Sequence, residues 1–262
     1  MKNKNRKLLA VVWLLVLSMG LSGCTLLQFD DPAEIKQQEE ELEKQQNITL
    51  PDAQALLKPD KLVMDEHLTS EDGADLAVYQ AEFPWFEAGE YAALQNINSY
   101  YEGEFSHLAS DKDRFFRLVE EKPSNALRSS TFSYELLDAP AGYIAILRAF
   151  ESVDTLGSTG KIYTCDLFEA TTGWKLKFSD LFGAQEKAAL GQLRTDLATW
   201  CADKSYDAAW LDGLTDDLLT QNITLSTETL YVGFDRTVVP GGETLIELDL
   251  TPYTGWLKTV TD

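Results

Sequence analysis

The spacing of apolar residues divides the chain into an apolar segment, a polar segment and a long patterned region. An unbroken apolar run extends from Leu8 to about Leu21. The stretch AEIKQQEEELEKQQ, residues 33–46, has only three scattered apolar residues and therefore no side that could face a core. From about Leu62 onward, apolar residues recur with the periods of strands and helices, which predicts a folded domain at residues 62–258.

Several runs in this region alternate between apolar and polar residues as strands do. The first two, LVMDEHLTS and ADLAVYQAEF, flank Glu71-Asp72-Gly73, a turn sequence that predicts a β-hairpin. Further runs follow one another between glycine-containing turns and indicate an antiparallel meander: TFSYELLDA, YIAILRAFESVD, KIYTCDLFEA and WKLKF. The last predicted strands are NITLS, TLYVGFD and ETLIELDL.

Helical spacing separates these groups of strands. Apolar residues three or four positions apart predict a first long helix: Tyr91, Leu94, Ile97, Tyr101, Phe105 and Leu108. A similar set predicts a second helix: Leu190, Leu193, Leu197 and Trp200. A third helix is predicted over residues 206–219. Strands and helices in blocks, without regular βαβ alternation, predict an α+β fold of antiparallel sheets with packed helices.

The N-terminus has the features of an export signal. Residues 1–7 carry four cations and no acid, and the apolar run after them is shorter than the ~20 residues that span a bilayer. The run ends in Leu21-Ser22-Gly23-Cys24, which resembles the lipobox of bacterial lipoproteins. We therefore expect removal of residues 1–23, a diacylglyceryl group on Cys24, and anchoring on the extracytoplasmic face of the cell membrane. The alternatives are a plain signal peptide with a chance cysteine, or an uncleaved helix.

Residues 24–61 are predicted to tether the folded domain to this anchor. Asp31, Pro32 and Glu34 form a helix start, with Asp31 as the N-cap. The polar stretch that follows is expected to be a solvated helical spacer or disordered. Residues 47–61, which contain two prolines, are predicted to be a linker.

The chain is strongly acidic. It has 43 Asp and Glu residues against 22 Lys and Arg, a net charge of −21, and loss of the four cations of residues 1–23 takes this to −25. Binding to nucleic acid requires clustered Lys and Arg that contact phosphates, so this composition excludes nucleic acid as a partner. The charge repels anionic lipid and attracts basic partners, and the simplest alternative is that it only keeps an exported protein soluble.

The sequence lacks motifs for catalysis or for metal binding. His67 and His107 are isolated, and no Cys/His cluster has zinc spacing. There is no Gly-x-Ser-x-Gly elbow, and GSTGK at residues 157–161 lacks the spacing of a phosphate loop. Carboxylates are so abundant that pairs able to flank a glycosidic bond are expected by chance. We expect no catalytic residue, metal or cofactor, and keep a carboxylate-based glycan hydrolase as a third alternative.

Five residues are candidates for a structural bond or for a binding surface. Cys165 and Cys201 could form a disulfide in an oxidising compartment, or remain two buried thiols. Trp85 and Phe86 follow a strand end, and Trp174 follows a glycine turn. From such positions an aromatic ring could stack on a sugar or fill a partner's cleft, and the alternative for each ring is ordinary core packing.

A series of short motifs, in a fixed order over residues 62–258, carries a resemblance to a known family. The motifs are Phe83-Pro84, Asn96-Ile97-Asn98-Ser99-Tyr100-Tyr101, Thr164-Cys165-Asp166-Leu167-Phe168, Thr172-Gly173-Trp174-Lys175-Leu176, Ser179-Asp180-Leu181-Phe182, Asn222-Ile223-Thr224-Leu225, Leu230-Tyr231-Val232-Gly233-Phe234-Asp235 and Pro240. Together they resemble the extracytoplasmic domain of RsiV-like proteins. That family comprises a lysozyme-sensing anti-sigma factor and its relatives, including modules attached to polysaccharide deacetylases.

The resemblance implies a two-part RsiV-like domain, with a boundary near residues 180–184, that binds rather than catalyses. It suggests lysozyme or another muralytic enzyme as the partner, with cell-wall peptidoglycan as the alternative. The chain departs from the family in two respects. The turn at residues 157–160 lacks the family's histidine, and the seven residues ahead of the apolar run are too few for a domain that holds a sigma factor. The motifs themselves identify no partner-contact residue.

Overall fold

The computed structural model describes residues 50–122, 126–154, 157–158 and 160–258. All of these residues lie in one compact unit, Lys44–Asp262. The predicted signal segment and Cys24 lie outside the described residues. Among the helices that are described, none combines the length and the apolar character needed to cross a bilayer.

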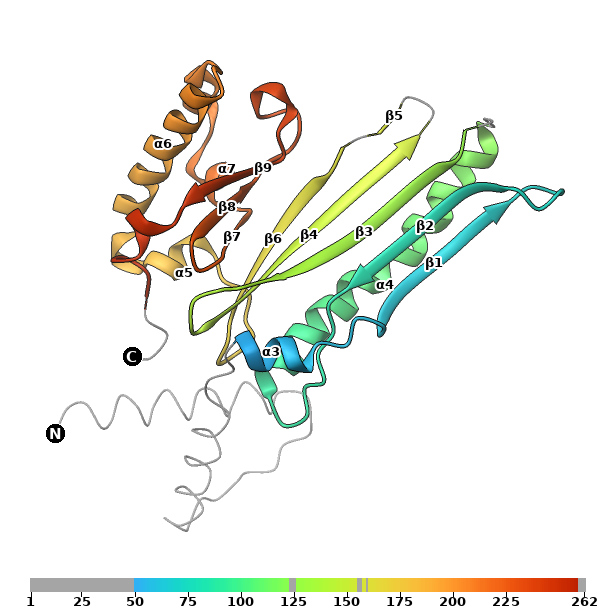
Figure 1. Ribbon diagram of the computed structural model, residues 1–262, viewed down its shortest axis with the longest axis horizontal. Helices are drawn as coiled ribbons and strands as arrows, with labels where there is room; N and C mark the ends of the chain where they lie inside the picture. The colour runs from blue at the N-terminus through green and yellow to red at the C-terminus, as the bar shows by residue number, and fades with distance from the viewer. Residues whose placement is uncertain (1–49, 123–125, 155–156, 159, 259–262) are drawn as a thin grey trace, which may run out of the picture. The chain divides into compact units, whose positions relative to one another are not determined.

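A large mixed sheet forms the first half of this unit (Figure 1). Its strands are β1 (Leu62–Thr69), β2 (Asp75–Phe83), β3 (Arg128–Leu137), β4 (Tyr143–Asp154), β5 (Gly157–Ser158) and β6 (Ile162–Glu169). They follow the order β1-β2-β3-β4-β5, and β6 also pairs with β4. The predicted hairpin is confirmed, because β1 and β2 pair antiparallel over their whole length.

One strand pairing in this sheet differs from the antiparallel expectation. Strands β2 and β3 are parallel, whereas β3–β4 and β4–β6 are antiparallel. The reason is helix α4 (Ala92–Glu121), which carries the chain back along the sheet before β3 begins. The run WKLKF does not form a full strand, and its only β-bridge in the described part joins Lys175 to Phe168.

A small antiparallel sheet forms the second half, as the sequence predicts. Its strands are β7 (Ile223–Leu225), β8 (Thr229–Gly233) and β9 (Leu245–Asp249), in the order β7-β8-β9. The α-helices besides α4 are α3 (Leu50–Leu56), α5 (Phe178–Phe182), α6 (Glu186–Asp203) and α7 (Asp216–Thr220). Short 3₁₀ turns are η1 (Gly183–Gln185), η2 (Ala208–Gly213), η3 (Pro240–Gly242) and η4 (Thr251–Tyr253).

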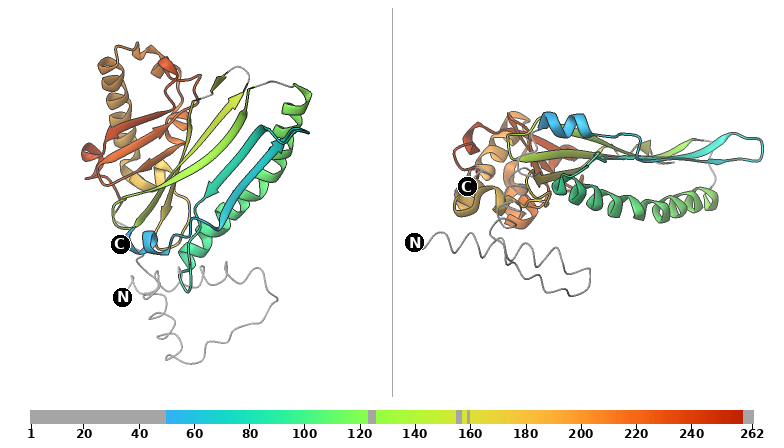
Figure 2. Two further views of the ribbon diagram at one scale, coloured as in Figure 1. Left: turned by 45° about the vertical axis from the view of Figure 1, so that its right-hand side comes forward. Right: turned by 90° about the horizontal axis from the view of Figure 1, so that it is seen from below.

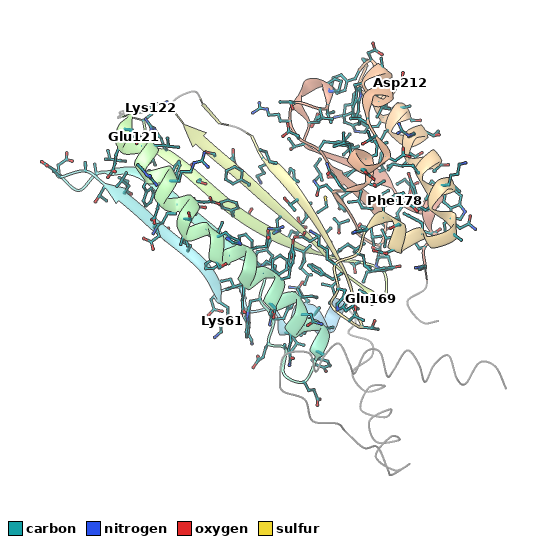
Figure 3. All side chains as sticks on the ribbon, turned by 180° about the vertical axis from the view of Figure 1, so that it is seen from behind. Lys61, Glu121, Lys122, Glu169, Phe178 and Asp212 are labelled. Carbon is teal, nitrogen blue, oxygen red and sulfur yellow. The ribbon has the colours of Figure 1, made fainter. Side chains whose placement is uncertain are left out.

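The long helix α4 follows the predicted apolar stripe and extends it. The helix is 30 residues long and buries Leu94, Ile97 and Tyr101 against the sheet. Its far end, marked by Glu121 and Lys122 in Figure 3, is closed by Arg128 of β3. The Arg128 guanidinium donates to the backbone carbonyls of Leu118 and Lys122, which lack partners within the helix.

The predicted third helix is wrong, because residues 206–219 form two short helical pieces. The extended backbone at Leu214 separates η2 from α7. Each piece has its own cap: Asp207 accepts from the Ala209 N–H, and Thr215 accepts from the Leu218 N–H. Two N-cap residues so close in sequence mark two helix starts rather than one continuous helix.

Two hydrophobic cores lie on opposite faces of the large sheet. Alternate residues of β4 supply each: Ile144 and Ile146 join the core under α4, and Ala145 and Leu147 join the second core. Helix α6 and the small sheet complete the second core. Because this core draws on strands β3, β4 and β6 as well as on later residues, a boundary near residues 180–184 does not separate the two cores.

The folded part begins earlier than Leu62. Helix α3 lies in the predicted linker, and its Ala53 is fully buried in the core under α4. Leu57, just after the helix, forms an antiparallel bridge with Phe86. Proline at Pro51 is compatible with this helix because it occupies the first turn, where the backbone N–H needs no helical acceptor.

Candidate functional site

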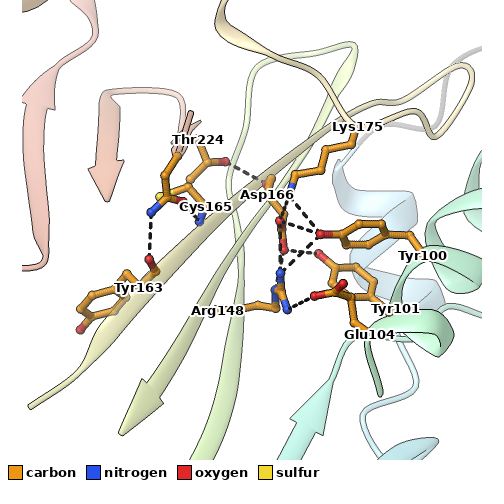
Figure 4. A network of polar contacts seen from close by, with 10 residues as sticks. Tyr100, Tyr101, Glu104, Arg148, Tyr163, Cys165, Asp166, Lys175 and Thr224 are labelled. Carbon is orange, nitrogen blue, oxygen red and sulfur yellow. Dashed lines mark hydrogen bonds and ion pairs between the residues drawn. The ribbon is translucent and has the colours of Figure 1, made fainter. Parts of the chain in front are cut away.

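A polar network surrounds the carboxylate of Asp166 on β6 (Figure 4). Asp166 is completely buried and faces α4. Its Oδ2 accepts from Arg148 Nε at 2.6 Å and from the Tyr101 hydroxyl at 3.1 Å, and its Oδ1 is paired with the Lys175 ammonium. A buried carboxylate needs such partners because water cannot solvate it.

The network reaches the surface through its basic residues. Arg148 Nη1 donates to Glu104 Oε2 of α4 at 3.2 Å. Lys175 Nζ lies 3.0 Å from the Tyr100 hydroxyl of α4. Two cations therefore meet two carboxylates, and their contacts tie α4 to β4, to β6 and to the segment that follows β6.

The protonation states of the network follow from burial and from Asp166. Burial, reinforced by the Asp166 charge, raises the pKa of Tyr101 well above its ordinary value and also raises the pKa of Tyr100. Burial alone would lower the pKa of Arg148 and of Lys175, but the neighbouring Asp166 carboxylate raises both. The hydroxyls stay protonated and the Lys175 amine stays charged, so this network offers neither a nucleophile nor a free base. Its role is to hold the fold together.

Two residues at β7 form side-chain hydrogen bonds with the backbone of β6. Asn222 Oδ1 accepts from the Cys165 N–H at 2.6 Å, and its Nδ2 donates to the Tyr163 carbonyl at 3.0 Å. Thr224 Oγ1 donates to the Asp166 carbonyl at 3.0 Å. The motif Asn222–Leu225 is therefore the joint between the two sheets, because its side chains satisfy backbone groups that β6 leaves open there.

Among the predicted binding aromatics, Phe86 is a correction. Its ring is fully buried in the core under α4, and the Asn98 side chain bonds to both its N–H and its carbonyl. Trp85 is partly buried; its Nε1 donates to Glu102 at 3.2 Å, and Lys61 lies over its ring. Trp174 is 62% exposed, so of the three rings it alone is largely open to a ligand.

The two cysteines described by the structure are separate, buried thiols. Burial, and secondarily the Asp166 charge, raises the pKa of the Cys165 thiol to about 12. The Cys201 sulfur accepts from Trp210 Nε1 at 3.2 Å. Of the two alternatives for this pair, the structure has the thiols and not the disulfide. Cys24, the predicted lipid-attachment residue, lies outside the described residues.

Two surface hollows in the described part are lined by acids and hydroxyls. The first measures about 240 Å³ and includes Val63, Asp65, Gln80, Glu82, Thr131 and Ser133. The second, at the β8–β9 end of the small sheet, measures about 530 Å³ and includes Thr227, Glu228, Thr229, Glu247, Asp249 and Thr254. Neither lining contains Lys or Arg. Nor does the described region hold any group of three or more His, Cys, Asp or Glu arranged to bind a metal ion.

The sequence interpretation did not single out the residues of the first hollow. Asp65 and Glu82 are the polar members of two alternating strands, and the signal that could have identified them is this alternation. Alternation alone does not reveal whether a polar side of a sheet is covered by another element. Only the position of α4 decides that.

Comparison with solved structures identifies proteins that have the same fold as this chain. No family model matches the chain, and no curated protein matches it. A crystal structure of a DUF3298 family protein from Pseudomonas aeruginosa PAO1 matches with a TM-score of 0.55 and 14% identity, over 78% of this chain and 94% of that chain. The fold is shared with DUF3298 proteins. A second member, from Bacteroides fragilis NCTC 9343, has a TM-score of 0.49 and 15% identity over the same shares of the two chains. The α+β fold with sheets and packed helices is thereby confirmed, and similarity at this identity extends to the fold alone.

Proposed function

We propose that the chain is a lipid-anchored binding protein that captures a basic protein at the outer face of the cell membrane. The observation that carries this proposal is that both acidic hollows lack cations, on a chain whose net charge without residues 1–23 is −25. The resemblance to RsiV-like domains names lysozyme, or another muralytic enzyme, as the partner. The network around Asp166 supports binding over catalysis, because its polar groups are used in holding the fold.

The charge would act mainly on the rate of association. A strongly acidic domain steers a basic partner toward itself, and this attraction weakens as ionic strength rises. At about 0.15 M salt the interaction between exposed charges fades beyond about 8 Å, so the remaining affinity depends on close contacts. Binding in this way could inhibit a muralytic enzyme or keep it from the cell wall.

The test is a calorimetric titration of residues 25–262 with a basic animal lysozyme, at about 0.01 M and about 0.15 M ionic strength. These residues include both cores, so the shortened chain keeps the folded unit. We expect saturable binding near one to one that weakens as salt rises. An absence of heat at both salt concentrations would remove lysozyme as the partner.

The anchor is a separate part of the proposal. Replacement of Cys24 removes the thiol on which the lipid is carried. We expect Cys24→Ala to move the protein out of the membrane fraction of the producing cell, while a Cys165→Ala control stays in it. Retention of Cys24→Ala in the membrane fraction would contradict the lipoprotein assignment.

A second candidate function, binding of cell-wall glycan, is favoured by Trp174. Its indole is 62% exposed, a large apolar surface to leave in water without a ligand. Stacking on a neutral sugar is much less sensitive to salt than charge steering. Titration with soluble peptidoglycan fragments, for the unaltered chain and for Trp174→Ala, tests this candidate, and release of reducing sugar in the same samples would point to the hydrolase instead.

A further inference from the structure

The large sheet has one face that no described element covers along β1, β2 and the first part of β3, whereas the end of β3 at Leu137 enters the second core. In the right-hand view of Figure 2, α4 lies along one side of these strands, and their opposite side is bare over the part of the hairpin that extends beyond α3. Because strand side chains alternate, Tyr79, Ala81 and Phe83 of β2 enter the core under α4, while Gln80 and Glu82 point to the opposite side. We call this opposite side of the three strands the open face.

The open face is acidic and carries no Lys or Arg. Strands β1 and β2 contain neither residue, and the single cation of β3 is Arg128. Arg128 does not reach the open face, because its guanidinium is occupied with carbonyls at the end of α4. The charged side chains exposed on this face include Asp65, His67 and Glu82.

The first hollow lies on this face and joins acidic and apolar surface. Val63 is 45% exposed in its lining and adds an apolar surface beside the acids. Gln80 Nε2 donates to Asp65 Oδ1 at 3.2 Å, which holds that carboxylate in the hollow. Thr131 and Ser133 of β3 add hydroxyl groups to its lining.

We propose that the open face is the surface on which the basic partner docks, with an arginine or lysine of the partner entering the hollow between Asp65 and Glu82. This inference rests on the proposed function and specifies its surface. The lining of the hollow suits both parts of such a side chain. Its methylene groups would cover Val63, and its charged group would contact carboxylates and hydroxyls. An arginine suits the hollow best, since its planar group donates to several acceptors at once.

The second hollow is the other surface on which a basic partner could dock, and it lacks the combination of exposed apolar and acidic side chains. Leu248, its apolar member, is buried rather than exposed. Asp249 accepts from the Thr251 N–H at 2.9 Å, as Asp65 accepts from Gln80, so the two hollows differ in exposed apolar surface and not in free acceptors. The second hollow therefore provides a matched control with the same sign of charge.

The experiment compares two double variants of residues 25–262 by calorimetric titration with a basic animal lysozyme at about 0.15 M salt. Asp65→Asn with Glu82→Gln removes two charges from the open face, and Glu228→Gln with Glu247→Gln removes two from the second hollow. Each double variant makes the net charge less negative by two, so the general electrostatic attraction of a basic partner changes by the same amount. We expect the first pair to raise the Kd about 10–100-fold and the second pair to raise it less than about 3-fold.

A third variant tests whether weaker binding could be explained by loss of folding. Val63→Arg places a cation at the rim of the hollow without removing a core side chain, and we expect it to weaken binding at least as much as the double variant. Circular dichroism and thermal unfolding check that each variant is folded. Equal weakening by the two double variants, or greater weakening by the second, overturns the open face while leaving the proposed function intact. No binding by the unaltered chain overturns both.

Discussion

Acidic side chains have different surroundings on the two faces of the large sheet. On the face under α4, Asp166 is fully buried and is met by Arg148 and Lys175. On the open face, Asp65 and Glu82 are exposed, and no Lys or Arg of β1 to β3 opposes them. A buried charge must be paired for the protein to be stable, whereas an exposed charge is solvated by water and remains available to a partner. The face under α4 thus contributes to stability, and the open face is the one on which we propose that a partner binds.

The largest expected effect on stability comes from breaking the buried ion pairs of Asp166. Asp166→Asn removes the carboxylate and leaves the mostly buried Arg148 guanidinium without its main partner. We expect the free energy of unfolding to fall by about 3 kcal/mol, because an uncompensated buried charge is costly and only part of the network is open to water. Urea denaturation measures this. Asp65→Asn is the matched control on the open face, and a similar loss in both variants would contradict the contrast between the faces.

A second large effect is expected where the covered face is most tightly packed. Gly173, in the turn that leads to Lys175, has φ +69°, and a Cβ at this position would lie 2.0 Å from the Ala93 carbonyl oxygen. We expect Gly173→Ala to destabilise the protein by about 2 kcal/mol. Gly191→Ala is the control: it lies within α6 with no atom near its added Cβ, so a gain of about 0.5–1 kcal/mol is expected in the same thermal unfolding assay.

The open face is expected to tolerate the loss of charges that the buried face does not. Asp65→Asn with Glu82→Gln should change the free energy of unfolding by no more than about 0.5 kcal/mol, since both side chains are exposed. Urea denaturation of this variant, beside Asp166→Asn, measures the difference directly. A loss above about 2 kcal/mol would show that these acids stabilise the sheet, and would weaken their assignment to binding.

The smallest expected effect is a pH dependence at the edge of the open face. His67 Nδ1 lies 3.1 Å from Asp75 Oδ2 and its Nε2 lies 3.3 Å from Asp65 Oδ1. The hydrogen bond to Asp75 is the main cause that raises the pKa of His67 above its ordinary value of 6.5, and the charges of both carboxylates add to it. The folded state therefore holds this proton more tightly than the unfolded state does.

The sign of this pH dependence follows from the raised pKa. The stabilisation from His67 is fully present below pH 6.5 and is lost as the pH rises through the raised value. Thermal unfolding of the unaltered chain and of His67→Gln across this range measures it, with His107→Gln as the control. We expect the difference between the unaltered chain and His67→Gln to shrink at high pH and at high salt. A difference that grows with pH would contradict the ion pairs.

Local sequence patterns were sufficient for much of the fold. The hairpin of β1 and β2, the long helix α4 and the three strands of the small sheet follow from apolar spacing and turn residues, because these signals act over a few neighbouring positions. The same local reasoning failed at residues 206–219. There two N-cap residues, Asp207 and Thr215, start separate helical pieces within a stretch of helical composition.

The candidate site depended on contacts between distant residues. Phe86 and Trp174 look equally suited to binding in the sequence, yet Phe86 is buried in the core under α4 and held by Asn98, while Trp174 is exposed. Likewise, the residues around Asp166 in the sequence do not reveal its two basic partners, which come from β4 and from the segment after β6. Asp166 meets Arg148 because β4 is the paired neighbour of β6, and it meets Tyr101 because α4 packs on the face to which both side chains point.

The acidic charge and most of the strands and helices follow from the sequence alone, and the sequence also predicts export and lipid attachment at Cys24. These depend on composition and on residues a few positions apart, where periodicity and capping act. Only the tertiary structure decided that β2 and β3 run parallel, that Asp166 is paired, and that Asp65 and Glu82 face outward. The parallel pairing comes from the crossover through α4, whereas the pairing of Asp166 and the exposure of Asp65 and Glu82 depend on which side of the sheet α4 covers. That choice comes from burying apolar surface contributed by segments far apart in the chain.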